Sequence, residues 1–411
     1  MAGETTRWTY MPILLLIFAS RATCYPKRTN EISIPPSHKF LDFIYTTAKE
    51  GYLSVEYPVV TEDGYILRMF RIVEAKNCNR SKLQPPVLLM HGLLESSDVW
   101  TDGGPSTGLA YLLSDACFDV WLGNVRGNYY SRRHTILDPD HDLTYWQFTA
   151  DEMGRYDLPA MVDFVLNNTG SEKLNYVGFS QGGGTFFIMC SERPEYCEKV
   201  YVMIALAPAT RLLNSRLLSF RVAAQSAALL ENDLRSAGVG EVLNRGSLTQ
   251  KFLVKYCPLN SLTQTLCRNY VTSQDLLHPG SIADDTFDNI FHHFPAGTSL
   301  HNLAKYGQGV VSPKFAKFDY GRERNLELYG QINPPEYNLD AVSTPVVIIY
   351  GRNDGVVDHQ DIKWLIGRLP NVIDVVEVED PLWNHEDMHY SRYFKSLVFP
   401  TVYEHLLVNS Y

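Results

Sequence analysis

Short apolar runs alternate with longer amphipathic stretches along most of the chain. The apolar runs are rich in β-branched and aromatic residues, which is typical of buried strands, and they lie at residues 86–90, 120–122, 174–177, 200–205, 346–350 and 372–378. The stretches with helical character lie among them, at residues 106–113, 157–166, 183–189 and 360–369. Strands that alternate with helices predict the α/β class, with a mostly parallel central sheet and helices on both of its faces.

This alternation stops between residues 211 and 338. The segment has few β-branched runs, and Leu213, Leu217, Phe220 and Ala224 share one helical face. We therefore predict a mainly helical insertion at 211–338, within a core domain made of residues 23–210 and 339–411. Most of the apolar face is expected to pack as core. The alternative is that part of it forms a movable lid over an apolar cleft.

The first residues have the layout of a secretory signal peptide. Arg7 precedes the apolar run at residues 11–19, and the small residues Ser20 and Ala22 follow it. We predict a signal at residues 1–22, with cleavage after Ala22 or Cys24, and hence a secreted or lysosomal protein. No apolar run reaches the roughly 18 residues of an integral membrane helix, so no membrane span is expected.

Composition and charge exclude other classes of protein. The chain has 411 residues, of which 45% are hydrophobic, and this is enough apolar material to argue against disorder. Its 36 Lys and Arg are outnumbered by 46 Asp and Glu, giving a formal net charge of −10. A chain with this charge would be repelled by a phosphate backbone, so nucleic acid is not an expected partner. The sequence does not indicate an oligomeric state.

Export would place the cysteines and sequons in an oxidising compartment. The chain has seven cysteines, and Cys257 and Cys267 could close a small loop, although the sequence does not fix any pairing. Asn79 and Asn167 each begin an Asn-x-Ser/Thr triplet and are candidate glycosylation sites. There is no Cys-x-x-Cys pair, so no structural zinc site is expected.

The most informative segment has the sequence LNYVGFSQGGG at residues 174–184. Gly178-x-Ser180-x-Gly182 follows a predicted strand and opens a predicted helix, which is the context of a nucleophile elbow. The sharp turn exposes the serine, and the glycines leave room for neighbouring backbone. A dinucleotide-binding loop is rejected, because the required glycine spacing and downstream acidic residue are absent.

A second loop has the sequence HGLLESS at residues 91–97 and directly follows a predicted strand. In a serine hydrolase of this layout, such a loop supplies one backbone N–H to the oxyanion hole, and the residue after the nucleophile supplies the other. Leu93 and Gln181 are therefore the expected donors. His91 precedes Ser180 in the chain, and we interpret it as a structural histidine that shapes the turn.

The remaining members of a catalytic triad are expected downstream of the serine. Asp354 follows the predicted strand at 346–350, and His385 lies in a loop after the strand at 372–378. The order Ser180, Asp354, His385 is the one this fold uses. Asp358 is a local competitor, but Asp354 lies closer to the end of the strand.

One motif points to a different chemistry. Residues 385–389 read HEDMH and match H-E-x-x-H, which on a helix places two imidazoles on one face to bind zinc. A zinc peptidase is therefore a formal alternative. We disfavour it because few residues follow His389 and because Trp383 and Asn384 are typical of a loop. The serine constellation also already accounts for His385.

With these motifs in place, the chain resembles the acid lipase family of α/β-hydrolases, the gastric and lysosomal acid lipases and their insect relatives. The resemblance runs from about residue 57 to residue 385. It is carried by the segments 61–67 (TEDGYIL), 91–93 (HGL), 123–128 (GNVRGN), 131–134 (SRRH), 151–153 (DEM), 156–160 (YDLPA), 178–182 (GFSQG), 293–299 (HFPAGTS), 353–354 (ND) and 384–387 (NHED).

The resemblance implies hydrolysis of neutral-lipid esters, such as triacylglycerols or sterol esters, at a lipid–water interface and without a cofactor or metal. It supports the catalytic set Ser180, Asp354 and His385 with Leu93 and Gln181 as oxyanion donors. It also implies that 211–338 is a cap containing a lid and that Cys257 pairs with Cys267.

Three positions depart from the family pattern. Phe179 stands where the family usually has histidine, Glu386 follows the catalytic histidine, and Met388 replaces an aromatic residue. A carboxylate beside His385 is expected to raise the pKa of the imidazole. The remaining alternative function is a non-catalytic lipid-binding or storage protein on the same scaffold, because fold alone does not determine activity.

Overall fold

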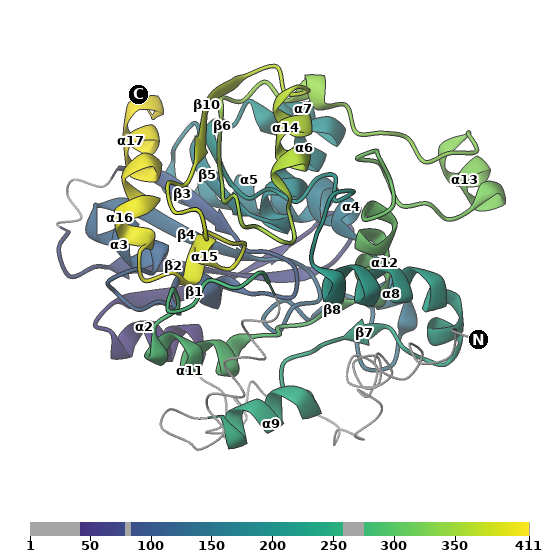
Figure 1. Cartoon of the computed structure of the whole chain (residues 1–411), viewed down its shortest axis with the longest axis horizontal. Helices are drawn as coiled ribbons and strands as arrows, with labels where there is room; N and C mark the ends of the chain where they lie inside the picture. The colour runs from purple at the N-terminus through teal and green to yellow at the C-terminus, as the bar shows by residue number, and fades with distance from the viewer. Residues whose placement is uncertain (1–41, 79–83, 258–274, 411) are drawn as a thin grey trace, which may run out of the picture.

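The computed structural model describes residues 42–78, 84–257 and 275–410. At its centre lies an eight-stranded sheet with the order β1-β2-β4-β3-β5-β6-β9-β10 (Figure 1). The strands are β1 (Leu53–Val60), β2 (Ile66–Glu74), β3 (Gln84–Met90), β4 (Phe118–Asn124), β5 (Leu174–Phe179), β6 (Val200–Leu206), β9 (Val346–Tyr350) and β10 (Val372–Glu377). The predicted signal at 1–22 and the predicted sites at Asn79 and Cys267 lie outside the described residues.

The sheet confirms the predicted α/β class and its mostly parallel pairing. Parallel pairing joins β4, β3, β5, β6, β9 and β10 in that order, and these are the six predicted strands. The antiparallel pairs are β1 with β2 and β2 with β4, at one edge of the sheet. The sequence interpretation did not include β1 and β2. Residues along β1 are mostly exposed or half-buried, so this strand carries no continuous apolar run.

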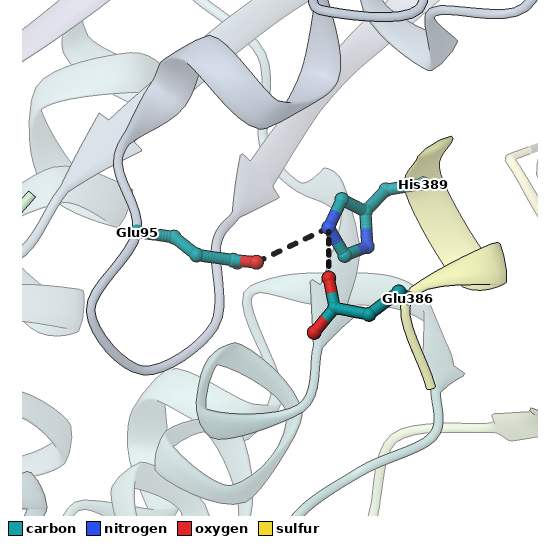
Figure 2. Close-up of side chains that lie close together, drawn as sticks. All are labelled: Glu95, Glu386 and His389. Carbon is teal, nitrogen blue, oxygen red and sulfur yellow. Dashed lines mark ion pairs between the residues drawn. The ribbon is translucent and has the colours of Figure 1, made fainter. Parts of the chain in front are cut away.

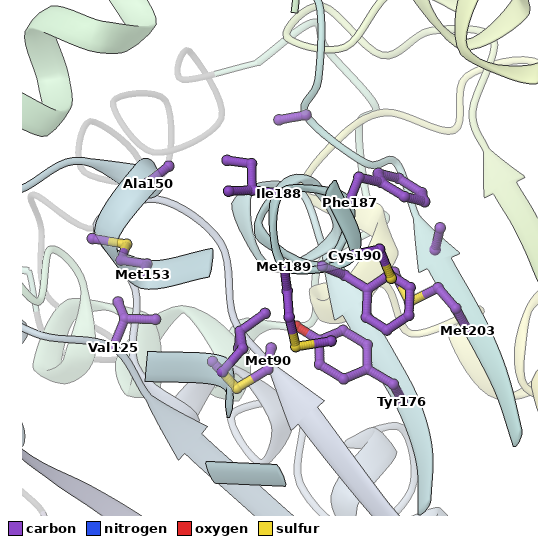
Figure 3. Close-up of a cluster of buried hydrophobic side chains, with 14 of the residues drawn as sticks. Met90, Val125, Ala150, Met153, Tyr176, Phe187, Ile188, Met189, Cys190 and Met203 are labelled. Carbon is purple, nitrogen blue, oxygen red and sulfur yellow. The ribbon is translucent and has the colours of Figure 1, made fainter. Parts of the chain in front are cut away.

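Helices cover both faces of the sheet. Packed on one face are α5 (Leu158–Thr169), α6 (Gln181–Glu192) and α14 (His359–Ile366), and packed on the other are α2 (Phe43–Lys49), α3 (Leu109–Asp115) and α17 (Phe399–Asn409). Figure 3 shows α6 above the sheet, with Met189 pointing toward Met90 and Tyr176 and with Ile188 and Phe187 on other sides of the helix. Each fully buried large apolar side chain contributes about 1.5–3 kcal/mol. This packing fixes the carboxyl ends of the strands, where the candidate catalytic residues lie.

Among the described residues between β6 and β9, most of the elements are helices. The elements are α8 (Leu218–Ser236), β7 (Glu241–Val242), α9 (Leu248–Tyr256), α11 (Asp284–His293), β8 (Thr298–Ser299), α12 (Leu300–Gly309), α13 (Arg322–Tyr329) and η5 (Leu339–Ala341). Figure 1 shows α8 and α12 side by side and α9 at the periphery. A Cβ atom on Gly307 would lie 2.0 Å from the carbonyl oxygen of Ala224, so this close packing of α8 and α12 depends on glycine. We call residues 211–338 the inserted segment.

Disulfides add covalent ties at the edges of the core. Cys78 is bonded to Cys117, which joins the end of the β1–β2 hairpin to the start of β4, and Cys190 is bonded to Cys197 across the end of α6. Cys257 is buried and also disulfide-bonded. Bonds of this kind persist in oxidising compartments. Among the described helices, none is both long and apolar enough to cross a membrane.

Candidate active site

Ser180 lies at the turn between β5 and α6, with the strained backbone that an elbow requires. Its φ of 49° and ψ of −113° are unusual for a residue with a side chain. A Cβ atom on Gly178 would lie 2.7 Å from Gly182 backbone, and a Cβ atom on Gly182 would lie 2.3 Å from the carbonyl oxygen of Met90. Gly178 is therefore needed for the tight closure of the turn itself, and Gly182 for the close approach of the turn to β3.

The structure brings the three predicted catalytic residues together. His385 Nε2 lies 2.9 Å from Ser180 Oγ, and His385 Nδ1 lies 2.7 Å from Asp354 Oδ2. The other carboxylate oxygen of Asp354 accepts hydrogen bonds from the backbone N–H groups of Val356 and Val357. All three catalytic side chains are buried. Ser180, His385 and Asp354 thus form the chain of contacts that a nucleophilic serine needs.

The competing carboxylate Asp358 is used elsewhere. It lies 2.9 Å from Arg216 Nε, and it accepts a hydrogen bond from the backbone N–H of Gln360 at the start of α14. Both ring nitrogens of His91 have backbone partners, which agrees with its interpretation as a structural residue. Its Nδ1 lies 2.8 Å from the carbonyl oxygen of Gly92, and Val125 donates its backbone N–H to Nε2.

The electrostatic environment of His385 favours its charged form. Burial by itself would lower the pKa of the imidazole, but the charge and hydrogen bond of Asp354, followed by the charges of Asp275 and Glu386, raise the pKa to about 9. Glu386 therefore raises the pKa of His385, as expected from the sequence, although Asp354 and Asp275 raise it more. Asp275 belongs to the inserted segment and was not recognised in the sequence.

The two expected oxyanion donors lie at the start of α6 and in the loop after β3. Gln181 is the first residue of α6, so its backbone N–H is one of those that have no partner within the helix. Its side-chain oxygen accepts hydrogen bonds from Asn302 Nδ2 and Tyr306 Oη on α12. Leu93 is half-buried in the loop after β3. Glu95 braces that loop, because its Oε2 accepts a hydrogen bond of 2.6 Å from the backbone N–H of Gly92.

The HEDMH motif contributes to two different clusters. His385 faces Ser180 and Asp354, whereas His389 Nε2 lies 3.1 Å from Glu95 Oε1 and 3.6 Å from Glu386 Oε2 (Figure 2). Helix α15 (Asp387–Tyr390) begins after His385, so the two imidazoles are not on one helical face. One atom from each of Glu95, Glu386 and His389 could reach a common metal ion, since these atoms lie within 4.8 Å of one another.

An ion pair is the simpler account of this cluster. Burial would raise the pKa of Glu95, but the charge and hydrogen bond of His389 hold it below its usual value. Burial raises the pKa of Glu386 instead, which favours its neutral form. Glu95 therefore already has a partner in His389, and the contact is accounted for without a metal ion. The ring of Phe179 packs between the two histidines, with its centre 4.7 Å from that of His385 and 4.4 Å from that of His389.

Comparisons with known proteins agree with this architecture. A family model described as the alpha/beta hydrolase fold matches residues 85–388, and one described as a partial alpha/beta-hydrolase lipase region matches residues 43–104. The chain is 38% identical to Lipase 1 of Drosophila melanogaster, over 86% of this chain and 76% of that protein. It is 38% identical to gastric triacylglycerol lipase of Bos taurus, over 82% of this chain and 84% of that protein.

The chain belongs to the lipase family of α/β-hydrolases. The resemblance inferred from its motifs is thus confirmed, and the chain is a hydrolase of the lipase and esterase class. The human gastric triacylglycerol lipase is 35% identical over 82% of this chain and 83% of its own length. A solved structure of a Sulfolobus solfataricus protein shares the fold, with a TM-score of 0.57 and 12% identity over 87% of this chain and 94% of that one.

Proposed function

We propose that the protein hydrolyses carboxylic esters of neutral lipids through a Ser-His-Asp acyl-enzyme mechanism. The observation that carries this proposal is the unbroken chain of contacts from Ser180 Oγ through His385 to Asp354. The names of the relatives support the substrate class, because several of them are triacylglycerol lipases. The substrate would be a triacylglycerol or a sterol ester, met at a lipid–water interface.

In this mechanism His385 Nε2 takes the proton of Ser180 as Oγ attacks the ester carbonyl carbon. Asp354 holds the Nδ1–H tautomer and stabilises the imidazolium. The backbone N–H groups of Leu93 and Gln181 bind the developing oxyanion, and the N-terminus of α6 favours its negative charge. His385 then gives the proton to the leaving alcohol, and a water molecule activated by the same imidazole releases the fatty acid.

The inserted segment 211–338 is proposed to be a cap whose outer part serves as a lid over the catalytic serine. Exposed apolar side chains on α9, Leu248 and Phe252 among them, would suit contact with lipid. The disulfides support secretion or lysosomal delivery after removal of residues 1–22. Glycosylation is proposed at Asn79 and Asn167, and Asn167 is exposed near the end of α5. Enzymatic deglycosylation followed by intact-mass analysis tests these two sites.

Replacement of the nucleophile tests the mechanism. Ser180→Ala should lower the rate of hydrolysis of a soluble short-chain ester by on the order of 10,000-fold or more, because the acyl-enzyme cannot form. Ser396→Ala is a suitable control, since Ser396 is exposed on α16 (Phe394–Leu397), and it should retain full activity. Undiminished turnover in Ser180→Ala would reject the serine mechanism.

Two further measurements define the function. A serine-directed phosphonate probe should label the wild-type chain and not Ser180→Ala. Absence of labelling together with tight binding of lipid would favour the non-catalytic lipid-binding alternative. The substrate class is tested with triacylglycerol, sterol ester, retinyl ester and a soluble short-chain ester from acidic to alkaline pH. Activity that rises once the substrate exceeds its solubility would identify interfacial catalysis.

A further inference from the structure

A short stretch of the inserted segment, residues 275–282, runs between the two loops that carry Asp354 and His385. Several hydrogen bonds join it to those loops. Asn353 donates to the carbonyl oxygen of Leu277 and Asn384 to that of Leu276, while His278 Nδ1 lies 2.7 Å from Asp387. The stretch is therefore fixed to both loops and not merely packed above them.

The buried carboxylate of Asp275 lies at the centre of this arrangement. Its Oδ1 accepts a hydrogen bond of 2.9 Å from the backbone N–H of Gly355, the residue that follows Asp354. Its Oδ2 accepts one from the backbone N–H of His385 itself. A Cβ atom on Gly355 would lie only 2.7 Å from Asp275 Oδ1, so the absence of a side chain at 355 allows this approach. One carboxylate thus links the two catalytic loops directly.

The start of the inserted segment contacts the same residue, Gly355, through its carbonyl group. The carbonyl oxygen of Gly355 accepts hydrogen bonds from the backbone N–H groups of Arg216 and Leu217, at 2.8 and 2.9 Å. Ser215 Oγ also donates to it. The residue next to Asp354 is therefore held through its N–H by Asp275 and through its C=O by residues 215–217. Both groups of contacts come from the inserted segment.

We propose that Asp275 is a positioning residue for ester hydrolysis, which holds the Asp354 loop and the His385 loop at the separation that their catalytic contact requires. The inference rests on the proposed function, because it concerns the same triad. It makes the geometry of the triad depend on the docking of the inserted segment. A displacement of about 1 Å between such groups lowers rates by about 100-fold, so small changes at Asp275 should be visible in turnover.

The charge of Asp275 has a separate, measurable effect. The groups that face it are Asp354, His385 and Glu386, on the two catalytic loops. Burial, together with the charge of Asp354, raises the pKa of Asp275 to about 8. When ionised, Asp275 raises the pKa of His385. Loss of this charge should therefore lower the pKa of His385 and move the acid limb of the kcat/KM profile to lower pH, because the imidazole must be neutral to act as base.

Asp275→Asn is the test. The amide has nearly the same size, but its NH2 group would face a backbone N–H, so at least one of the bonds to Gly355 and His385 is lost. For a soluble short-chain ester we expect kcat to fall by about 10- to 100-fold with KM nearly unchanged. We also expect the acid limb of the kcat/KM profile to shift to lower pH. Asp285→Asn is the matched control, since Asp285 is exposed at the first turn of α11, and both parameters should stay at wild-type values.

The outcomes separate this inference from the proposed function. If wild type hydrolyses the ester and Ser180→Ala does not, the function stands, and a folded Asp275→Asn chain with unchanged kcat and acid limb overturns the inference alone. If Asp275→Asn does not fold, Asp275→Glu decides. It keeps the charge but alters the reach, so kcat should fall while the acid limb stays in place. Wild-type kcat in Asp275→Glu would then overturn the inference.

Discussion

At the scale of single residues, His385 is surrounded by more negative charge than Asp354 alone supplies. Asp354, Asp275 and Glu386 all raise the pKa of His385, against the effect of its burial. In the proposed mechanism the imidazole must be neutral to take a proton from Ser180, so each of these carboxylates should shift the acid limb of activity to higher pH. Their individual contributions can be separated by neutral, isosteric substitutions.

Glu386→Gln should shift the acid limb of kcat/KM to lower pH. Of the three carboxylates that raise the pKa of His385, Glu386 has the smallest effect. The shift should therefore be smaller than that caused by Asp275→Asn. Measurement of kcat/KM for a soluble ester against pH checks this. Glu379→Gln is the control, because Glu379 is exposed after β10. An unchanged limb, or a shift to higher pH, would contradict the electrostatic role of Glu386.

The contact of Ser180, Asp354 and His385 could be predicted from the sequence because each follows a strand and because their order is that of the fold. Asp275 could not be recognised in this way. It belongs to a segment without strong periodicity, and its partners are backbone N–H groups of residues that lie far along the chain. Glu95 and His389 were seen as parts of motifs, but only the folded chain shows that they contact each other.

At the scale of elements, the strands that could be predicted from the sequence are those with continuous apolar runs. The parallel strands β3, β5 and β9 are buried on both faces, so their sequences are nearly all apolar. Most residues of the edge strand β1 are exposed or half-buried, so its sequence has no continuous apolar run. The pattern of apolar residues is therefore too weak to distinguish this strand from a loop. The pairing of α8 with α12 has no simple signature either, since it depends on one small residue at the contact.

Gly307→Ala should destabilise the protein. The added Cβ atom would lie 2.0 Å from the carbonyl oxygen of Ala224, which is backbone and cannot rotate away, so α8 and α12 must move apart. We expect a loss of about 1–3 kcal/mol in the free energy of unfolding, measured by urea denaturation. Gly309→Ala lies on the same helix in open space and should be neutral or slightly stabilising. Equal effects of the two variants would contradict this account of the helix contact.

At the scale of the whole molecule, the stability of the core has a covalent component. The Cys78–Cys117 bond closes a loop of 39 residues, which includes β3 and α3. In the chain-entropy model, closing a loop of this size lowers the entropy of the unfolded state. The bond therefore stabilises the sheet without adding to the contacts of the catalytic loops.

The double variant Cys78→Ser, Cys117→Ser should lower the free energy of unfolding by about 2–4 kcal/mol. The denaturant dependence, the m-value, should rise because the unfolded chain becomes more expanded. Urea unfolding measures both quantities, and kcat for the soluble ester should remain near wild type under native conditions. An unchanged free energy of unfolding would show that the bond does not constrain the unfolded chain.

The order of the catalytic residues along the chain has a consequence for synthesis. Ser180 precedes the inserted segment, whereas Asp354 and His385 follow it, and His385 lies 205 residues after the serine. Domains fold from the N-terminus as the chain emerges from the ribosome. A growing chain that ends before β9 therefore has Ser180, the proposed nucleophile, without His385, the proposed base. In the proposed mechanism, ester cleavage therefore begins only once nearly the whole polypeptide has been made, and unfinished chains do not cleave esters.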